Sequence, residues 1–509
     1  MRPAYIVGLF TILTVLSLLG PSYGQPPRAA VPTFVFQSSP QHYVTLLPKL
    51  PSSSPSPWIV YPTNTTIWVA GIATPPKSQI REFFIDGTSK GVLNLTNAIV
   101  NSILADPLNP SSKVWFTVNS TLAFYDTNVG IRTNAITFQG QSIQYLANDR
   151  RGRIWMSMLS SSGTNSSIAM YDPSGPSNQT YLVPTSGALI QGITVNAQGN
   201  TIWFAEAGSK KIGRLIPEAF PPVSEYAPPA SINLSAPIQV AVDASGGVWF
   251  TDHGSNQFGV LNPGASPATS TWRVFPIGYC PDSCVYGLPN AVFVDAKNSI
   301  WFSEHIAGRV GHYDPLTGAL TEYVIPSSST PLMWWAMPGP NNLVWFVAWG
   351  LGQIGYVNAS IPVPFSLSGP SSDVVVQRGT TANVPVQVNS HAAMTIFFGL
   401  SPVTQDQPLQ FPAQIYGSSP SNLTLNNNSH TVSFGVSAAW NATPGPRYVA
   451  LTASNGQVAV NAHVRIIIVE ASAPYVALGF SSAIILGGSA IYLRKLKKPK
   501  VQPVKKTRR

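Results

Sequence analysis

The chain has 509 residues, of which only 9% are charged, together with 47 prolines and 40 glycines. This length exceeds one ordinary domain, and the scarcity of charged helix formers excludes a mainly helical protein and favours an all-β chain rich in turns. The formal net charge is +10, but nine positive residues lie within 494–509, so the rest carries only +1 and gives no indication of nucleic-acid binding.

The first residues have the pattern of a secretory leader. Arg2 precedes an apolar run over residues 6–19, and small residues near Gly24 offer a cleavage site. We expect residues 1–24 to be a signal peptide. An uncleaved membrane anchor is the alternative.

A short motif recurs seven times between residues 67 and 346. Each copy has an aliphatic residue, then Trp, then usually Phe, and the tryptophans are Trp68, Trp115, Trp155, Trp203, Trp249, Trp301 and Trp345. They are 47, 40, 48, 46, 52 and 44 residues apart. A period of about this length without a helical pattern predicts a β-propeller with one four-stranded blade per copy. We therefore expect a seven-bladed propeller over residues 34–360, with each Trp buried between blades.

The segment around Tyr43 resembles the last segment of later repeats, which contains Tyr181, Tyr226 or Tyr323. The seventh copy continues to Tyr356 and then lacks such a segment. We expect the N-terminal strand to supply it, because this joins the two ends of the ring in one blade and leaves no open sheet edge between them.

Cys280 and Cys284 are the only cysteines, and they lie in one loop. In an oxidising compartment we expect them to close a small disulfide loop. Two cysteines do not make a zinc site without further ligands, and a catalytic thiol is the alternative.

The Trp period stops after residue 360. Short alternating runs such as 382–388 and 431–436 follow, separated by turn residues. They predict an Ig-like β-sandwich over residues 361–470. The stretch 443–448 resembles a corner of Ig-like modules on prokaryotic surface proteins. The position of this module, between the propeller and a C-terminal apolar segment, is that of a stalk.

Residues 474–493 contain no charge over twenty positions, which is enough for a helix to span a bilayer. The basic tail, 494–509, follows at once, so the positive-inside rule places the tail in the cytoplasm and the preceding chain outside the cell. We therefore expect a single-pass type I protein of the cell membrane. A buried core helix is the alternative for this segment.

Ten sequons for N-glycosylation lie on the predicted outer side. They start at Asn64, Asn94, Asn119, Asn165, Asn178, Asn233, Asn358, Asn422, Asn427 and Asn441.

The middle repeats resemble the repeat of the streptogramin (virginiamycin B) lyase family. The match is clearest from Ile193 through the Trp203 motif to Lys211 and Pro217, and it recurs around Trp249 and Trp301. The resemblance covers residues 40–360 and implies a seven-bladed propeller. In these lyases a magnesium ion polarises an ester, and a histidine acts as general base for the elimination that opens a macrocycle.

The resemblance also implies where a lyase site would lie. The metal carboxylate follows the Trp by three residues, a position held here by Glu206, Asp252 and Glu304, and His253 and His305 come directly after two of these. The general base would precede the Trp by about eleven residues. This chain has Gln191, Ile238, Asn290 and about Trp334 at those places, none of which can act as a base near neutral pH.

Three interpretations of the carboxylates stay open. They pair with basic residues or loop amides, or they hold Mg²⁺ or Ca²⁺ or a polar ligand at the mouth of the ring with His253 and His305, or they support lyase chemistry. The expected function is recognition or scaffolding at the cell surface, with an extracellular protein or glycan as ligand and no nucleic acid. The alternative is a metal-dependent lyase or hydrolase acting on a cyclic ester or lactone.

Overall fold

The computed structural model describes residues 42–52, 54–73, 77–175, 177–278, 287–402 and 415–471. This part of the chain is all-β, and its helices are 3₁₀ turns of three residues. The signal peptide expected at 1–24, the span at 474–493, the tail at 494–509 and the pair Cys280 and Cys284 lie outside the described residues. Within them, no helix has the length and apolar character needed to cross a bilayer.

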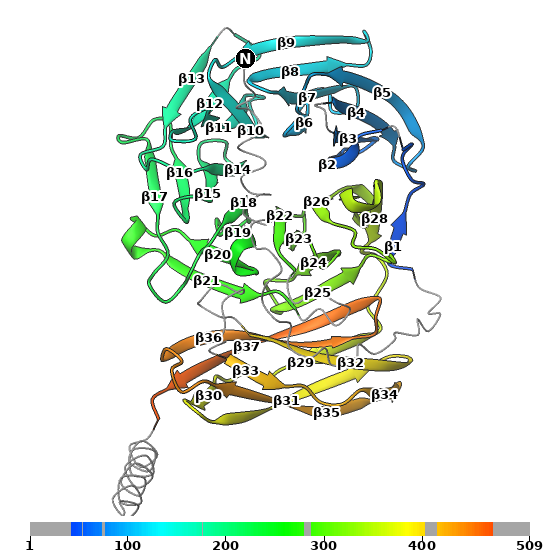
Figure 1. Ribbon diagram of the computed structural model, residues 1–509, viewed down its shortest axis with the longest axis vertical. Helices are drawn as coiled ribbons and strands as arrows, with labels where there is room; N and C mark the ends of the chain where they lie inside the picture. Colours follow the sequence, from blue (N-terminus) through cyan, green and yellow to red (C-terminus); the bar gives the residue numbers. More distant parts are fainter. Residues whose placement is uncertain are drawn as a thin grey trace, which may run out of the picture.

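Seven groups of four antiparallel strands form the blades of a ring (Figure 1). Blades 1 to 3 consist of β2 (Ser56–Pro62), β3 (Thr66–Ala73), β4 (Lys77–Phe84) and β5 (Ser89–Thr96); β6 (Ile103–Ala105), β7 (Lys113–Val118), β8 (Thr121–Asp126) and β9 (Ile131–Thr137); and β10 (Gln141–Asn148), β11 (Ile154–Ser160), β12 (Ser166–Tyr171) and β13 (Asn178–Leu182).

Blades 4 to 6 follow the same order from the centre outward. They consist of β14 (Ile190–Val195), β15 (Ile202–Glu206), β16 (Lys211–Leu215) and β17 (Val223–Tyr226); β18 (Pro237–Val242), β19 (Val248–Asp252), β20 (Gln257–Asn262) and β21 (Thr271–Pro276); and β22 (Pro289–Val294), β23 (Ile300–Glu304), β24 (Arg309–Tyr313) and β25 (Ala319–Val324).

Blade 7 combines the two ends of the ring. It contains β26 (Met333–Pro338), β27 (Leu343–Ala348), β28 (Gln353–Asn358) and, as its outer strand, the N-terminal β1 (Val44–Leu46). In the pairing of β1 with β28, Val44 lies opposite Val357. The first strand of each blade contacts that of the next around the centre, and β26 contacts β2 again (Figure 1). The ring is therefore closed, and the seven-bladed propeller predicted from the Trp repeat is confirmed.

The seven repeated tryptophans occupy the second strand of each blade, and every one is at most 4% exposed. In four blades an aspartate in the turn after the first strand accepts a hydrogen bond from the indole N–H. These pairs are Asp106–Trp115, Asp149–Trp155, Asp243–Trp249 and Asp295–Trp301, at 2.8 to 3.0 Å. The repeat is thus a core motif, as its spacing predicted.

Residues 365–469 form two further sheets that share an apolar core including Val384, Phe434 and Ile466. One sheet has the order β29 (Phe365–Ser368), β31 (Thr381–Ser390), β35 (Ser429–Ala438) and β33 (Ile415–Ser418). The other contains β30 (Val374–Gln377), β37 (Val458–Val469), β36 (Gly445–Ser454), β32 (Ala393–Pro402) and β34 (Leu423–Asn426). The Ig-like assignment of 361–470 stays a prediction.

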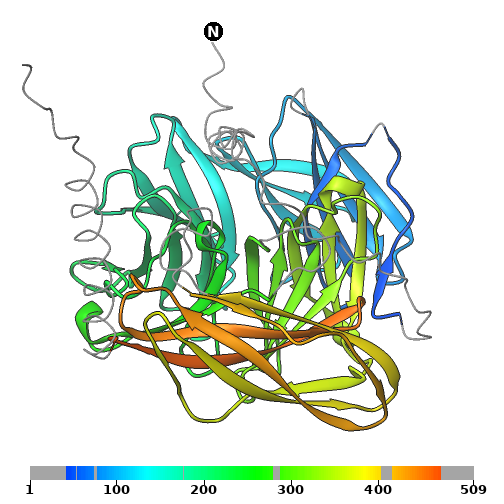
Figure 2. The ribbon, with the colours of Figure 1, turned by 60° about the horizontal axis from the view of Figure 1, so that its bottom comes forward.

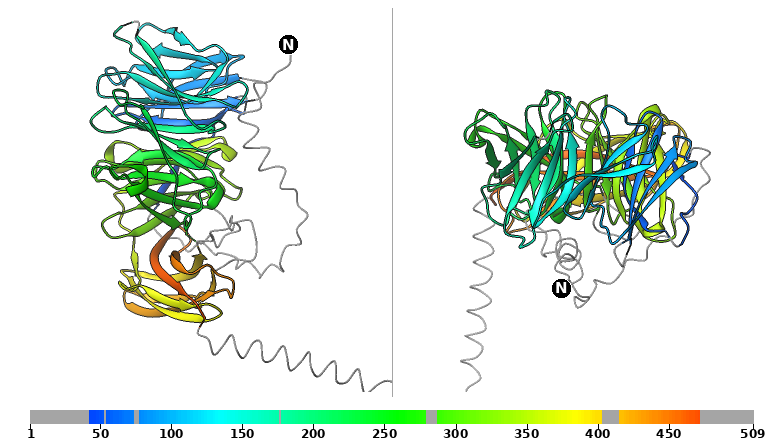
Figure 3. Two further views of the ribbon diagram at one scale, coloured as in Figure 1. Left: turned by 90° about the vertical axis from the view of Figure 1, so that its left-hand side faces the viewer. Right: turned by 90° about the horizontal axis from the view of Figure 1, so that it is seen from above.

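These C-terminal sheets are hydrogen-bonded directly to the ring. Strand β37 pairs antiparallel with β25, the outer strand of blade 6, and Leu320 lies opposite Asn461. Figures 2 and 3 show β37, in orange, running along the edge of the ring. This pairing was not expected from the sequence. It covers an otherwise open sheet edge, and a separate stalk does not require it.

Candidate functional site

The first strands carry a repeated irregularity at one end of the ring, which we call the mouth: the end where first strands begin and second strands finish. Six of the seven first strands shift register here against the second strand of their blade. The residues at the shift are Trp58, Gln144, Gln191–Gly192, Ile238, Asn290–Ala291 and Trp334. Such bulges re-aim side chains and are common beside functional sites.

These bulges include the positions where the lyase resemblance implies a general base. The structure places Gln191, Ile238, Asn290 and Trp334 there. Each of these positions therefore lies at a register shift, and none of them carries a histidine. Trp58, in blade 1, occupies the same place as Trp334 in blade 7.

Aromatic rings cover the mouth between blades 7 and 1. Trp58 and Trp334 stack with ring centroids 4.2 Å apart and planes inclined by 21°. Trp349, at the end of β27, meets the edge of Trp58 at 6.4 Å. Trp334 and Trp349 are half-buried, so part of this aromatic surface faces solvent.

Below this layer, aromatic rings from blades 3, 6 and 7 meet. Tyr145 of blade 3 stacks on Trp335 of blade 7, with centroids 5.8 Å apart and planes 12° apart. Phe293 of blade 6 meets the same Trp335 at 5.4 Å. Burial raises the pKa of the Tyr145 hydroxyl, and a hydrogen bond with Trp334 partly offsets this rise. Aromatic packing among blades 3, 6 and 7 therefore lies below the rings at the mouth.

The two histidines singled out from the sequence lie side by side at the mouth. His253 begins the 3₁₀ turn η2 (His253–Ser255) and His305 follows β23, and their ring centroids are 5.6 Å apart. His305 also meets Trp334 edge-on at 5.2 Å. Each histidine is 6% exposed. From blade 5 to blade 1 the imidazole and indole rings are therefore in continuous contact, with His253, His305 and Trp58 buried and Trp334 and Trp349 half-buried.

Burial keeps both imidazoles neutral. Desolvation lowers the pKa of His253 to about 4, although the nearby Leu288 and Pro289 carbonyls and the Asn290 side chain act in the opposite sense. Desolvation and the neighbouring His253 lower the pKa of His305 to about 3. Among the described residues, neither ring nitrogen of His253 has a hydrogen-bond partner, and neither polar side-chain atom of Asn290 has one. This cluster offers buried polar atoms to a ligand.

The Asp252 carboxylate accepts its hydrogen bonds from residues of its own blade. Its carboxylate accepts hydrogen bonds from the backbone N–H of Ala236 at 2.7 Å, from that of Ser235 at 3.1 Å and from Gln257 Nε2 at 3.0 Å. Burial raises its pKa, and these donors counteract the rise. The arrangement fixes the end of β19 and leaves little of this carboxylate for a ligand.

Glu206 is also fully buried, but it is poorly supplied with donors. The Ser209 hydroxyl donates to Oε2, while Oε1 has no hydrogen-bond partner among the described residues. Burial and the nearby Glu225 raise its pKa to about 7. Lys211, which faces Glu206 across the strands, instead forms an ion pair with Glu225 at 3.1 Å.

Glu304 occupies the corresponding position in blade 6. It lies opposite Arg309, whose Nη1 pairs with Glu322 Oε2 at 3.1 Å, and it packs closely against the backbone of Gly287. Within the described residues, no group of three or more His, Cys, Asp or Glu side chains is placed to hold a metal ion. The two histidines are thus in contact with each other, whereas Glu206, Asp252 and Glu304 are buried in three different blades.

Trp58 and Trp349 are mouth residues that were not identified from the sequence. Trp58 precedes Trp68 by ten residues, close to the offset of eleven between Trp334 and Trp345. That shared offset is the signal that could have indicated Trp58. Trp349 lies directly after the seventh motif and carries no such signal.

Comparisons with known proteins identify the fold. No protein-family description matches the sequence, and no curated protein matches it either. Among solved structures, a virginiamycin B lyase from Staphylococcus aureus superposes with a TM-score of 0.51 at 18% identity, over 62% of this chain and 99% of the lyase. A streptogramin B lyase gives 0.51 at 19% identity, over 62% and 97%. The ring therefore has the propeller fold of these lyases, as the repeat resemblance implied.

Proposed function

We propose that the chain is a recognition protein of the outer cell surface. Its propeller binds an extracellular protein or glycan at the mouth without converting it chemically, and one C-terminal span anchors it in the membrane. The observation that carries the proposal is the mouth itself, where half-buried indole rings adjoin two neutral histidines. Aromatic rings bordered by polar groups are characteristic of binding sites.

The chemistry of the same residues argues against lyase activity. A general base works best when its pKa lies near the operating pH, and His253 and His305 are held at about 4 and about 3. The carboxylate of Asp252 is already supplied with three donors. A protein that only binds its ligand needs neither a base nor an open carboxylate.

Two features of the chain support an outer location. The apolar segments at 6–19 and 474–493, with the basic tail after the second, have the pattern of a leader and a stop-transfer anchor. All ten sequon asparagines are exposed or half-exposed, and are accessible to a glycosylating enzyme. In this proposal the C-terminal sheets, paired to blade 6, hold the ring in a fixed orientation above the membrane.

Binding at the mouth can be tested with the full-length protein in detergent on an array of purified glycans and peptides. Trp334→Ala should weaken binding at least tenfold, because it removes half of the stack with Trp58. The matched control is Trp440→Ala, which removes an exposed indole from the C-terminal sheets. Binding that survives both Trp334→Ala and Trp58→Ala, or no binding by the unmodified protein, would contradict a recognition site at the mouth.

The location can be tested on intact cells. External protease should release fragments of the propeller while a tag on the tail stays protected, and glycosidase treatment should reduce the mass of the protein. A propeller that resists external protease until the membrane is broken would contradict the proposed topology.

A further inference from the structure

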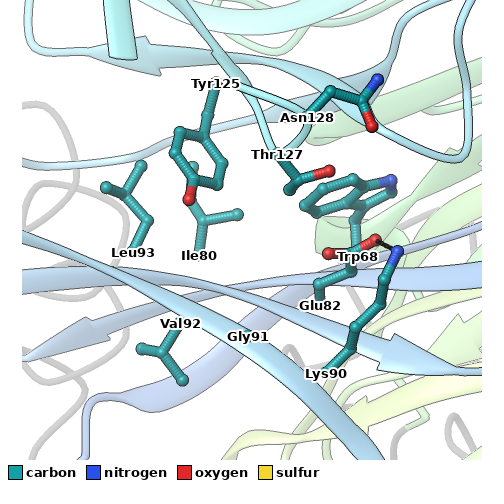
Figure 4. Close-up of a pocket in the computed structure, with 10 residues that line it drawn as sticks. All are labelled: Trp68, Ile80, Glu82, Lys90, Gly91, Val92, Leu93, Tyr125, Thr127 and Asn128. Carbon is teal, nitrogen blue, oxygen red and sulfur yellow. Dashed lines mark hydrogen bonds and ion pairs between the residues drawn. The ribbon is translucent and has the colours of Figure 1, made fainter. Parts of the chain in front are cut away.

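A pocket of about 350 Å³ lies between blades 1 and 2, away from the mouth. Strands β3, β4 and β5 form one side of it, and β8 with the turn that follows forms the other (Figure 4). Its volume is at the lower end of the range for small-molecule sites. None of the residues identified at the mouth contributes to it.

The pocket exists because blade 1 departs from the other blades in one row of residues. Across the strands, Trp68 lies opposite Glu82, and Glu82 lies opposite Gly91. At the place of Gly91 the other six blades carry a side chain. These residues are Thr133, Gln179, Ser224, Arg273, Thr321 and Thr45 in blades 2 to 7.

The missing side chain leaves open space. A Cβ atom built on Gly91 would meet no heavy atom within 4 Å. The residue opposite the Trp on the third strand is also unusual in blade 1, where it is Glu82. In blades 2 to 7 this residue is Phe124, Met170, Arg214, Val260, His312 and Tyr356. Blade 1 therefore has an acid beside its Trp and a hollow next to the acid.

The lining contains one negative side chain, Glu82, and one positive side chain, Lys90, so its net charge is zero. Glu82 is only 4% exposed, and its Oε1 lies 2.5 Å from Nζ of Lys90. This pair presents a carboxylate acceptor and an ammonium donor within one pocket, as Figure 4 shows. A net charge of zero favours a neutral ligand, since a charged ligand would be desolvated without a compensating partner.

The remaining walls come from both blades. Thr127 and Asn128 bring a hydroxyl and an amide from blade 2, and Tyr125 brings a ring from the same side (Figure 4). Trp68 lines the floor and is held by a hydrogen bond from its indole N–H to the Pro110 carbonyl at 3.1 Å. The site is thus preorganised, with polar groups on one part of its lining and apolar groups on the other.

We propose that this pocket binds a neutral polyhydroxylated ring, namely a single sugar residue at the end of a glycan. Vicinal hydroxyls donate and accept at once, which matches a carboxylate, an ammonium group and an amide placed together. The C–H faces of a sugar ring match the apolar walls formed by Tyr125, Val92 and Leu93. This inference does not rest on the proposed mouth, and either site can fail without the other.

The test uses the full-length protein carrying Trp334→Ala, so that the proposed mouth site does not contribute, and saturation-transfer difference NMR with glucose, galactose, mannose and N-acetylglucosamine. At least one of these sugars should receive saturation. Gly91→Thr should abolish the signal, because its side chain takes up the space beside Glu82, as the Thr of blades 2, 6 and 7 does at this place. Glu82→Gln should weaken binding at least tenfold, since an amide is a poorer acceptor for two hydroxyls.

Ser224→Thr is the matched control. It adds a methyl group at the same position of blade 4, and the lining residues of this pocket come from blades 1 and 2. It should leave the sugar signal unchanged, and thermal melting should show that Gly91→Thr remains folded. The proposal is overturned if no sugar receives saturation, if the signal persists in folded Gly91→Thr, or if tetramethylammonium competes for the pocket more strongly than any sugar.

Discussion

Asn461 and Glu322 meet where the C-terminal sheets join the ring, with Asn461 Nδ2 3.0 Å from Glu322 Oε2 across 139 residues of sequence. Glu322 is fully buried on β25 and also accepts hydrogen bonds from Arg309 Nη1 at 3.1 Å and from the backbone N–H of Gly278 at 2.8 Å. A buried carboxylate requires such donors. The C-terminal sheets therefore complete the polar interior of blade 6.

Asn461→Ala is expected to destabilise the whole assembly. The substitution removes a hydrogen-bond donor to the buried Glu322 carboxylate. It also removes the oxygen that accepts the hydrogen bond of the Thr452 hydroxyl. Losing a hydrogen bond to a charged group costs about 1.5 to 3 kcal/mol, measurable by chemical denaturation. Hydrogen exchange should accelerate along both β37 and β25.

Asn389→Ala provides the comparison for this junction. Asn389 lies on β31, and among the described residues its side chain bonds to the exposed hydroxyls of Ser366 and Ser429. Its replacement should change stability much less and leave exchange at β25 unaltered. Equal losses for the two variants would show that the junction contributes no special stability.

Asp295→Ala should lower stability through the core Trp of blade 6. Asp295 Oδ2 accepts the Trp301 indole N–H at 2.8 Å, and Oδ1 accepts the backbone N–H of Lys297 and Ser299. A buried indole N–H left without a partner costs about 1 to 3 kcal/mol. Differential scanning calorimetry should show the loss. Asp314→Ala, in an exposed turn of the same blade, should cost less because Asp314 holds no indole.

Glu206 should make the protein less stable as pH rises. Its native pKa is about 7, above the ordinary value of 4.5, so between these values the folded protein binds more protons than the unfolded chain and stability falls with rising pH. Glu206→Gln removes this dependence. The shift corresponds to at most about 3 kcal/mol at pH 8, and the interaction with Glu225 reduces this figure.

Denaturation curves from pH 4 to pH 8 provide the measurement. The variant should be more stable than the unmodified protein at pH 8 and similar to it near pH 4. Glu218→Gln, an exposed carboxyl of the same blade, is the control. A stability difference between Glu206→Gln and the parent that does not change with pH would show that Glu206 is not protonated in the folded state.

His253 and His305 should make the protein less stable as pH falls. The unfolded chain binds a proton at each imidazole near pH 6.5, whereas the folded protein does so only near pH 4 for His253 and pH 3 for His305, so stability is lost as pH falls below 6.5. NMR of the imidazole C–H resonances should show no titration of either residue above pH 5. A resonance of either histidine titrating between pH 6 and 7 would contradict the neutral mouth.

The ring itself was predictable because its signal is periodic. Seven tryptophans at near-constant spacing fix the number of blades, and the absence of a final segment after Tyr356 indicated that the strand near Tyr43 pairs with β28. Both features follow from local patterns that repeat along the chain.

The mouth was only partly predictable. His253, His305 and Trp334 were identified, but the Asp252 and Glu206 carboxylates turn inward to partners in their own blades, which depends on loop geometry and not on spacing. The β37–β25 pairing and the pocket at Gly91 arise from cross-strand register between distant segments. A single sequence carries no periodic signal for such register.

The most direct test concerns catalysis at the mouth. The full-length protein is incubated with a streptogramin B depsipeptide and millimolar Mg²⁺, and ring-opened product is followed by liquid chromatography and mass spectrometry. A recognition site with neutral histidines predicts no more product than buffer alone. Ring opening that the unmodified protein accelerates, and that His253→Gln or His305→Gln abolishes, would contradict it.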